Sequence, residues 1–150
     1  MGRGPVIVTV ERDVTIRASA TAIFEALTNF GPGSPWYTTV NEVRIEPPGP
    51  IGEGTAVTQV RDESGRRDVT RYRVAGFEQD RRLTLESVGV RPASTIDYTV
   101  AEEGPAVKLT CTITVTTAGF VRLVDSRLRR DLDRKLGETL DTFRGVMEQP

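Results

Sequence analysis

The chain has 150 residues, a length that favours one domain spanning residues 1–150. Its 20 basic and 21 acidic residues leave a net charge of -1, without the excess of positive charge typical of a nucleic-acid-binding protein. Hydrophobic residues make up 37% of the chain, which suffices for one core, and no apolar run is long enough to predict a membrane span.

The chain contains no histidine and a single cysteine, Cys111. An internal disulfide is therefore impossible, and no set of ligands at a suitable spacing predicts a metal site. Ser-His-Asp and Cys-His mechanisms are excluded, so any acid–base chemistry would use Asp, Glu, Lys, Tyr or water. The glycines of residues 49–54 lack the Lys-Ser/Thr of a phosphate loop, and we expect no cofactor. The apolar run near the N-terminus is too short for a signal peptide, which predicts a cytoplasmic protein.

The first 40 residues contain three predicted elements. Residues 6–17 alternate apolar and polar side chains and are rich in β-branched residues, which predicts a half-buried strand. Residues 18–30 then change to helical spacing, with Ser19 as the expected N-cap. Residues 31–40 are broken by glycine and proline, yet they hold the only tryptophan, Trp36.

The middle of the chain predicts six further strands, which makes about seven in all. Short alternating runs end at prolines, glycines or polar turns, as antiparallel strands joined by tight turns do. Gly65 marks one hairpin, and Glu103-Gly104-Pro105 marks another. The predicted strands lie within residues 41–48, 49–62, 68–80 and 81–90, with two more in 93–117.

Residues 119–149 contain no proline and predict one long helix. Apolar side chains recur every three or four positions and form one stripe: Val124, Leu128, Leu132, Leu136, Leu140, Phe143 and Met147. The opposite face is charged, and we expect its arginines to pair along the helix surface with Asp131 and Asp133. Gly137 is a position at which the helix could bend.

These elements predict an α+β fold. Its antiparallel sheet of about seven strands curves around the long C-terminal helix, with short helices after the first strand. The C-terminal helix is the element long enough to cover the apolar face of such a sheet.

The order of several local strings resembles the START-like or SRPBCC superfamily, the Bet v 1-like helix-grip fold. The closest likeness is to its bacterial polyketide cyclase/dehydrase-type branch. The strings cover nearly the whole chain: "SATAIFEALTNF", Trp36, "GPIGEGTAVTQV", "VAGFEQDRRLTLES" and "GFVRLVDSRLRRDLDRKLGETLDTF". The resemblance implies a deep, largely apolar cavity between the sheet and the C-terminal helix. The superfamily has no universal catalytic motif, so no catalytic residue carries over to this chain.

Strand alternation selects the side chains that would line such a cavity. Placing Tyr72 inward avoids burying the two arginines at positions 71 and 73. The predicted ligand-binding set joins polar groups that could orient a ligand to an aromatic and apolar wall: Trp36, Gln59, Tyr72, Ser87, Tyr98, Leu128, Leu132 and Phe143. For the two tyrosines, packing in the core with hydroxyls on water or backbone is the alternative. For Trp36, the alternatives are a loop anchor and a residue at the rim of the cavity. Cys111 is expected to pack as a small hydrophobe.

The expected partner is a hydrophobic or aromatic small molecule, polyketide- or lipid-like. The chain could serve natural-product biosynthesis or self-resistance by sequestration. The alternative is a polyketide cyclase or aromatase that shapes a reactive chain in the same cavity and uses tyrosine or water for proton transfer. A protein-interaction module ranks last.

Overall fold

The computed structural model describes residues 6–90, 92–117 and 122–149. Seven strands and two helices follow one another in the order that the sequence predicts, and several of them are shorter than predicted. The elements are β1 (Val6–Ile16), α1 (Ala20–Thr28), β2 (Glu42–Glu46), β3 (Ala56–Glu63), β4 (Arg66–Glu78), β5 (Arg82–Ser87), β6 (Ala93–Glu103), β7 (Ala106–Thr117) and α2 (Arg122–Met147).

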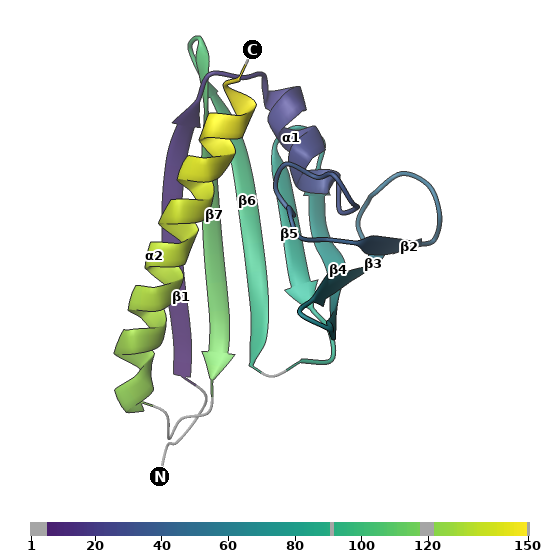
Figure 1. Cartoon of the computed structure of the whole chain (residues 1–150). Coiled ribbons are helices and arrows are strands. Elements are labelled where there is room, and N and C mark those ends of the chain that lie inside the picture. Colours follow the sequence, from purple (N-terminus) through teal and green to yellow (C-terminus); the bar gives the residue numbers. More distant parts are fainter. Residues whose placement is uncertain (1–5, 91, 118–121, 150) are drawn as a thin grey trace.

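The seven strands form one antiparallel sheet in the order β1-β7-β6-β5-β4-β3-β2 (Figure 1). Every neighbouring pair is antiparallel, which confirms the predicted sheet. The region between β1 and β2 differs from the prediction in one respect. Short helices are expected there, and the structure has the single helix α1, followed by turns over residues 31–39.

Two local features shape the β3–β4–β5 side of the sheet. The β3–β4 turn at Ser64-Gly65 has positive φ at both residues, 50° and 76°, as a two-residue hairpin turn requires. The hairpin predicted at Gly65 is therefore confirmed. In β4, the register with β5 shifts between Val74 and Gly76, and such a bulge bends a strand.

Helix α1 begins where the sequence predicts. The Ser19 side chain accepts a hydrogen bond from the backbone N–H of Ala22 at 3.0 Å, which caps the helix. Its apolar side chains are buried, and Phe24 contacts Phe77 of β4 edge to face. Helix α1 thereby covers one end of the inner face of the sheet.

Helix α2 runs along β1 (Figure 1). Its predicted stripe faces the sheet: Leu136, Leu140 and Phe143 are buried, whereas Leu128, Leu132 and Met147 are half-buried. The side chain of Val124 lies outside the described residues. Neither helix, over its described residues, is long and apolar enough to cross a membrane.

The contact between α2 and β1 corrects one prediction. Asp133 does not pair along the helix surface. It accepts two hydrogen bonds from Arg12 of β1, from Nε at 2.9 Å and from Nη2 at 2.8 Å. Arg12 lies between Val10 and Val14 along β1, and its side chain, 46% exposed, reaches α2 at the edge of the sheet. Asp131 does pair within the helix, with Arg134 at 4.0 Å.

Helix α2 is continuous through Gly137, from Arg122 to Met147. A Cβ atom at position 137 would stand 2.9 Å from Nη1 of Arg12. The missing side chain therefore leaves room for the guanidinium between helix and strand.

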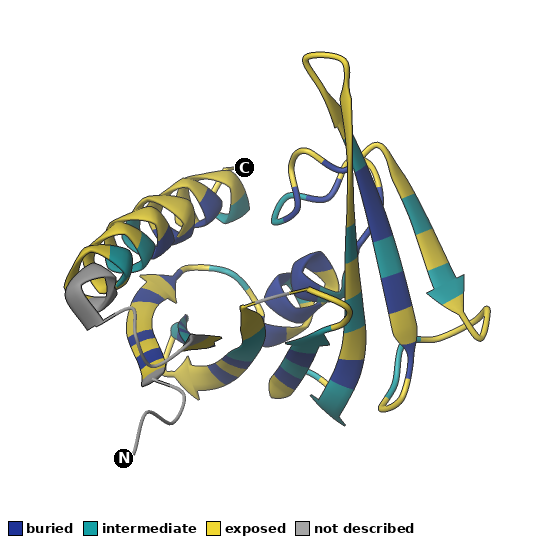
Figure 2. Ribbon diagram, turned by 90° about the horizontal axis from the view of Figure 1, so that it is seen from below, coloured by how far each residue is buried: buried dark blue, intermediate teal, exposed yellow. Residues whose placement is uncertain are grey.

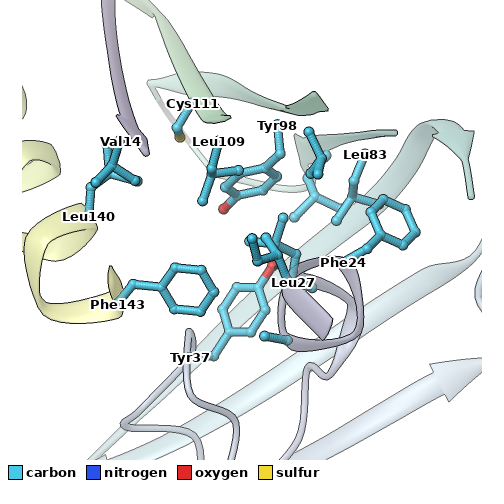
Figure 3. Close-up of a cluster of buried hydrophobic side chains, with 14 of the residues drawn as sticks. Val14, Phe24, Leu27, Tyr37, Leu83, Tyr98, Leu109, Cys111, Leu140 and Phe143 are labelled. Carbon is cyan, nitrogen blue, oxygen red and sulfur yellow. Dashed lines mark hydrogen bonds between the residues drawn. The ribbon is translucent and has the colours of Figure 1, made fainter. Parts of the chain in front are cut away.

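The core lies between the sheet, α1, residues 30–40 and the C-terminal half of α2. Figure 3 shows side chains from all of these parts meeting around the rings of Tyr37, Tyr98 and Phe143. Each of the three is at most 8% exposed. Cys111 is fully buried in this cluster, as predicted.

Candidate site on the inner face of the sheet

The inner face of the sheet is buried unevenly (Figure 2). Towards α1, Leu83, Leu85 and Leu109 are fully buried. Further along the same face, a second group of apolar side chains packs against the core but stays half-buried: Tyr72, Ile96, Ile113 and, from α2, Leu132. Ile96 and Ile113 lie directly opposite one another on β6 and β7. An apolar part of the inner face is thus accessible to solvent beside α2, and we call these four residues the open inner face.

The strand registers agree with the orientations predicted from alternation. Val57 and Gln59 on β3, Val74 on β4 and Tyr98 on β6 are buried on the inner side. On the outer side Arg71 and Arg73 are exposed. Asp97 also points outward, where it accepts hydrogen bonds from Arg82 and Thr84. The orientation of each predicted site residue on these strands is therefore correct, while its contact with a ligand stays a prediction.

Trp36 joins the loop to both the sheet and the helix. Its Nε1 donates a hydrogen bond to the Tyr98 hydroxyl at 3.0 Å. Its ring lies edge-to-face against Tyr98, with centroids 5.5 Å apart, and against Phe143 of α2 at 5.0 Å. Trp36 is only half-buried, so it is an anchor that still has an accessible side.

That accessible side lines a pocket of about 280 Å³ between the loop and α2. Pro35, Trp36 and Thr38 form the loop side, and Glu138, Thr139, Thr142 and Phe143 form the helix side. The volume lies just under the range of about 300–1,000 Å³ usual for small-molecule sites. Trp36 therefore separates this pocket from Tyr98 in the core.

The predicted polar residues differ in how far their hydrogen bonds are already used. Gln59 is fully buried, and its Nε2 donates to the carbonyl of Phe30 at 3.0 Å. The Ser87 hydroxyl accepts from the backbone N–H of Ser94 at 2.9 Å. The hydroxyl of Tyr72 makes no hydrogen bond with any described residue, although the side chain is half-buried. Among the predicted polar side chains on the strands, Tyr72 is therefore the one whose hydroxyl no described residue uses.

Burial controls the protonation of the reactive groups in the interior. Desolvation raises the pKa of Tyr98, Tyr37 and Tyr72 above the ordinary value of 10.0. Burial likewise raises the pKa of the Cys111 thiol to about 12. At neutral pH these groups are uncharged, so they can donate or accept hydrogen bonds but are poor bases and nucleophiles.

The sequence reasoning missed Arg61, which lies two residues after Gln59 and on the same face of β3. The guanidinium is held from three sides: Nε donates to Thr39 at 2.8 Å, Nη2 to the Gln59 side chain at 3.3 Å and Nη1 to Thr70 at 3.4 Å. Continuing the alternation from Val57 and Gln59 would have found it. Arg61 was not predicted to face inward because charged residues are expected to face solvent.

In the described part of the chain, no three of its cysteine, aspartate and glutamate side chains gather in a group that could hold a metal ion. The open inner face offers apolar contacts and the neutral Tyr72 hydroxyl, and the Arg61 guanidinium lies beside it.

Comparison with known proteins agrees with this architecture. A search of the curated proteins matches nothing. Among solved structures, a protein of unknown function from Staphylococcus aureus has a TM-score of 0.79 at 12% identity, over 96% of this chain and 95% of that one. A START superfamily protein from Mycobacterium smegmatis has a TM-score of 0.73 at 14% identity, over 94% of this chain and 97% of that one. The Zhui aromatase/cyclase from a Streptomyces species has a TM-score of 0.69 at 16% identity, over 95% and 94%. At such identities the likeness shows the fold alone.

The sequence itself matches one family over most of its length. Residues 8–148, from β1 to just past the end of α2, match the family described as "Polyketide cyclase / dehydrase and lipid transport". The resemblance found in the local strings is thereby confirmed. With its seven-stranded sheet, its long C-terminal helix and this match, the chain belongs to the polyketide cyclase/dehydrase and lipid transport family.

Proposed function

We propose that the chain binds a hydrophobic or aromatic small molecule, polyketide- or lipid-like, on the open inner face, between the sheet and α2. The observation that carries this proposal is the half-burial of Tyr72, Ile96, Ile113 and Leu132 beside a part of the same face whose leucines are fully buried. Apolar side chains left accessible on a concave surface mark binding grooves. A ligand there would complete the burial of this surface and gain roughly 25 cal/mol for each Å² of apolar area removed from water.

Binding without turnover ranks ahead of catalysis in this proposal. Among the described residues, α2 brings Asp133 towards the sheet, and Arg12 already holds that carboxylate. The phenol of Tyr72, with its raised pKa, is a weak base at neutral pH. A carrier in natural-product biosynthesis and a protein that sequesters a toxic product both fit such a surface. A cyclase that folds a reactive polyketide in the same place is the alternative, and it would work by enclosure and orientation.

An uncharged fluorescent probe tests the binding proposal. Phenylnaphthylamine is apolar and aromatic, and its emission rises when it leaves water. We expect it to bind the protein with an increase in probe emission and a change in the emission of Trp36, the only tryptophan. The second signal would place the probe near the contacts that Trp36 makes with Tyr98 and Phe143.

A pair of substitutions locates the probe. Ile113→Phe adds bulk to the open inner face, and we expect it to weaken probe binding at least about tenfold, since overpacking costs about 1–3 kcal/mol. Val69→Phe adds the same ring to the outer face of β4, where Val69 is 38% exposed, and should leave binding unchanged. If the wild-type protein fails to bind the probe, or if both variants bind it equally well, the proposed site is wrong. Conversion of an offered polyketide chain into a cyclised product would favour the cyclase.

A further inference from the structure

Arg61 is a positive charge on the inner face of β3, next to the open inner face. It is half-buried, and the groups that hold it are the neutral oxygens of Thr39, Gln59 and Thr70. No carboxylate among the described residues lies within 4.0 Å of it, whereas Arg12 of β1 pairs with Asp133 at 2.8 Å. Asp68 lies opposite Arg61 in the β3–β4 ladder but makes no such contact with it. A charge taken partly out of water without a direct ion pair is costly, so this arrangement calls for an explanation.

The guanidinium has donors to spare. An arginine side chain carries five N–H groups in a planar fork. Three of them donate to the neighbouring side chains, one each from Nε, Nη1 and Nη2. One N–H on each terminal nitrogen therefore remains. Terminal N–H groups of an arginine are the donors that hold the oxygens of a carboxylate or similar oxyanion.

The hydroxyl of Tyr72 is a second donor in the same region. Thr70 and Tyr72 lie opposite Gln59 and Val57 in the β3–β4 ladder, so Tyr72 is the next residue on the same face of β4 after the threonine that Arg61 contacts. Desolvation raises the pKa of Tyr72, and the positive charge of Arg61 acts on it in the opposite direction, which agrees with their closeness. The hydroxyl has no partner among the described residues and keeps its proton at neutral pH.

A purely structural role for Arg61 explains less. Tying Thr39 and Thr70 to β3 needs hydrogen bonds but no charge, and the buried amide of Gln59 already links β3 to the chain after α1. The charge, the spare N–H groups and the unused Tyr72 hydroxyl all remain unexplained by that role. Each of them is accounted for if an anion completes the site.

We propose that Arg61, with the Tyr72 hydroxyl, receives a singly charged oxyanion of the ligand, a carboxylate or sulfonate, while the apolar body of that ligand lies on the open inner face. The ligand class is thus an acidic amphipathic small molecule rather than a neutral hydrocarbon or sterol. This inference rests on the proposed function. That function concerns the apolar part of the ligand, and the inference adds where its charged group binds.

Two probes that share an aromatic skeleton and differ in charge test this inference separately from the proposed function. Anilinonaphthalene sulfonate carries the aromatic skeleton of phenylnaphthylamine and adds one sulfonate. We expect the wild-type protein to bind the sulfonate probe the more tightly of the two. Since hydrogen bonds to charged groups contribute about 1.5–3 kcal/mol, Arg61→Gln should weaken the sulfonate probe about tenfold to a hundredfold. The same substitution should change binding of the uncharged probe less than about twofold.

Matched variants and a salt titration distinguish loss of the oxyanion contact from a general loss of folded structure. Arg71→Gln removes an exposed arginine from the outer face of the neighbouring strand and should leave both probes unaffected. Arg61→Lys keeps the positive charge but lacks the planar set of N–H donors. Its affinity for the sulfonate probe should therefore lie between those of the wild-type protein and Arg61→Gln. In the wild-type protein, added salt should weaken the sulfonate probe only.

The outcomes divide cleanly. If the uncharged probe binds and the sulfonate probe binds no better, or if Arg61→Gln weakens both equally, the oxyanion site is overturned and the proposed function stands. If neither probe binds the wild-type protein, the proposed function fails and takes the oxyanion site with it.

Discussion

Trp36 donates a side-chain hydrogen bond to the hydroxyl of a second aromatic residue, Tyr98. The bond joins a loop to the centre of the sheet, and both partners also pack edge-to-face. A tryptophan N–H needs an acceptor when it leaves water, and the 2% exposed Tyr98 supplies one inside the core. Tyr98 is therefore a structural residue as well as a predicted ligand contact, whereas Tyr72 has its hydroxyl to spare.

At this scale the two tyrosines should respond differently to loss of the hydroxyl. Tyr98→Phe leaves the Trp36 N–H without its acceptor, and we expect a loss of about 1–3 kcal/mol in the free energy of unfolding, measured with urea. Tyr72→Phe removes a hydroxyl that no described residue uses, so the expected change is within about 0.5 kcal/mol. Equal losses in the two variants would contradict the assignment of these hydroxyls.

At the scale of elements, α2 is held to the sheet mainly through β1. Besides the Arg12–Asp133 pair, Glu148 accepts a hydrogen bond from the backbone N–H of Arg17 at 2.8 Å, just beyond the end of β1. Between these ties the apolar stripe is buried at Leu136, Leu140 and Phe143, whereas Leu132, just before Asp133, is half-buried. The helix thus closes one side of the inner face and leaves the region of Ile96 and Ile113 accessible.

Two helical glycines test how closely α2 packs on Arg12. At the exposed Gly145 a Cβ atom meets nothing within 4 Å, so Gly145→Ala should stabilise the protein by up to about 1 kcal/mol through helix propensity. Gly137→Ala offers the same propensity gain, but its methyl group would displace the Arg12 guanidinium from Asp133. We therefore expect a smaller gain or a net loss, measured by thermal unfolding.

A third variant isolates the cause. In an Arg12→Ala background the steric conflict is gone, so Gly137→Ala should recover the gain seen at Gly145. Should Gly137→Ala be as stabilising as Gly145→Ala in the wild-type background, the proposed packing of Arg12 under the helix is incorrect.

At the scale of the whole molecule, two carboxylates couple the docking of α2 to pH. The hydrogen bond from Arg12 lowers the pKa of Asp133 below its ordinary 3.8, and the backbone hydrogen bond from Arg17 lowers that of Glu148 below 4.5. A depressed native pKa stabilises the folded state fully above the ordinary value and loses that effect as the pH falls through the lowered value.

We accordingly expect the melting temperature to fall on acidification below about pH 4.5. Asp133→Asn and Glu148→Gln should each have a lower melting temperature than the wild-type protein at neutral pH. Their melting temperatures should also fall less steeply as the pH drops into the acid range. Exposed groups contribute modestly, so the slopes are the informative quantity. An acid limb unchanged in both variants would show that these two carboxylates do not carry the effect.

Much of the fold and part of the site could be predicted from the sequence. The alternation that places Val57, Tyr98 and Leu85 inward is a local signal, because successive side chains of a strand point to opposite faces. The stripe of α2 and the burial of Cys111 follow from similarly local patterns. The sequence pattern also selected Tyr72 over its neighbouring arginines, since an unpaired arginine in an apolar core is costly.

The inward arginines could not be predicted by the same rule, because their partners come from distant parts of the chain. Arg12 is tolerated on the inner face by Asp133, 121 residues away, and by the missing side chain of Gly137. Arg61 is held by Thr39, 22 residues earlier, together with its strand neighbours Gln59 and Thr70.

The amino-acid sequence by itself determined the elements, the faces of the strands and the family, because these depend on periodicity and local order. The folded structure was needed to learn which charges lie on the inner face, which hydroxyls are already bound and which apolar residues stay accessible. Those properties depend on what the folded chain places next to each side chain, and it is there that the candidate ligand site is found.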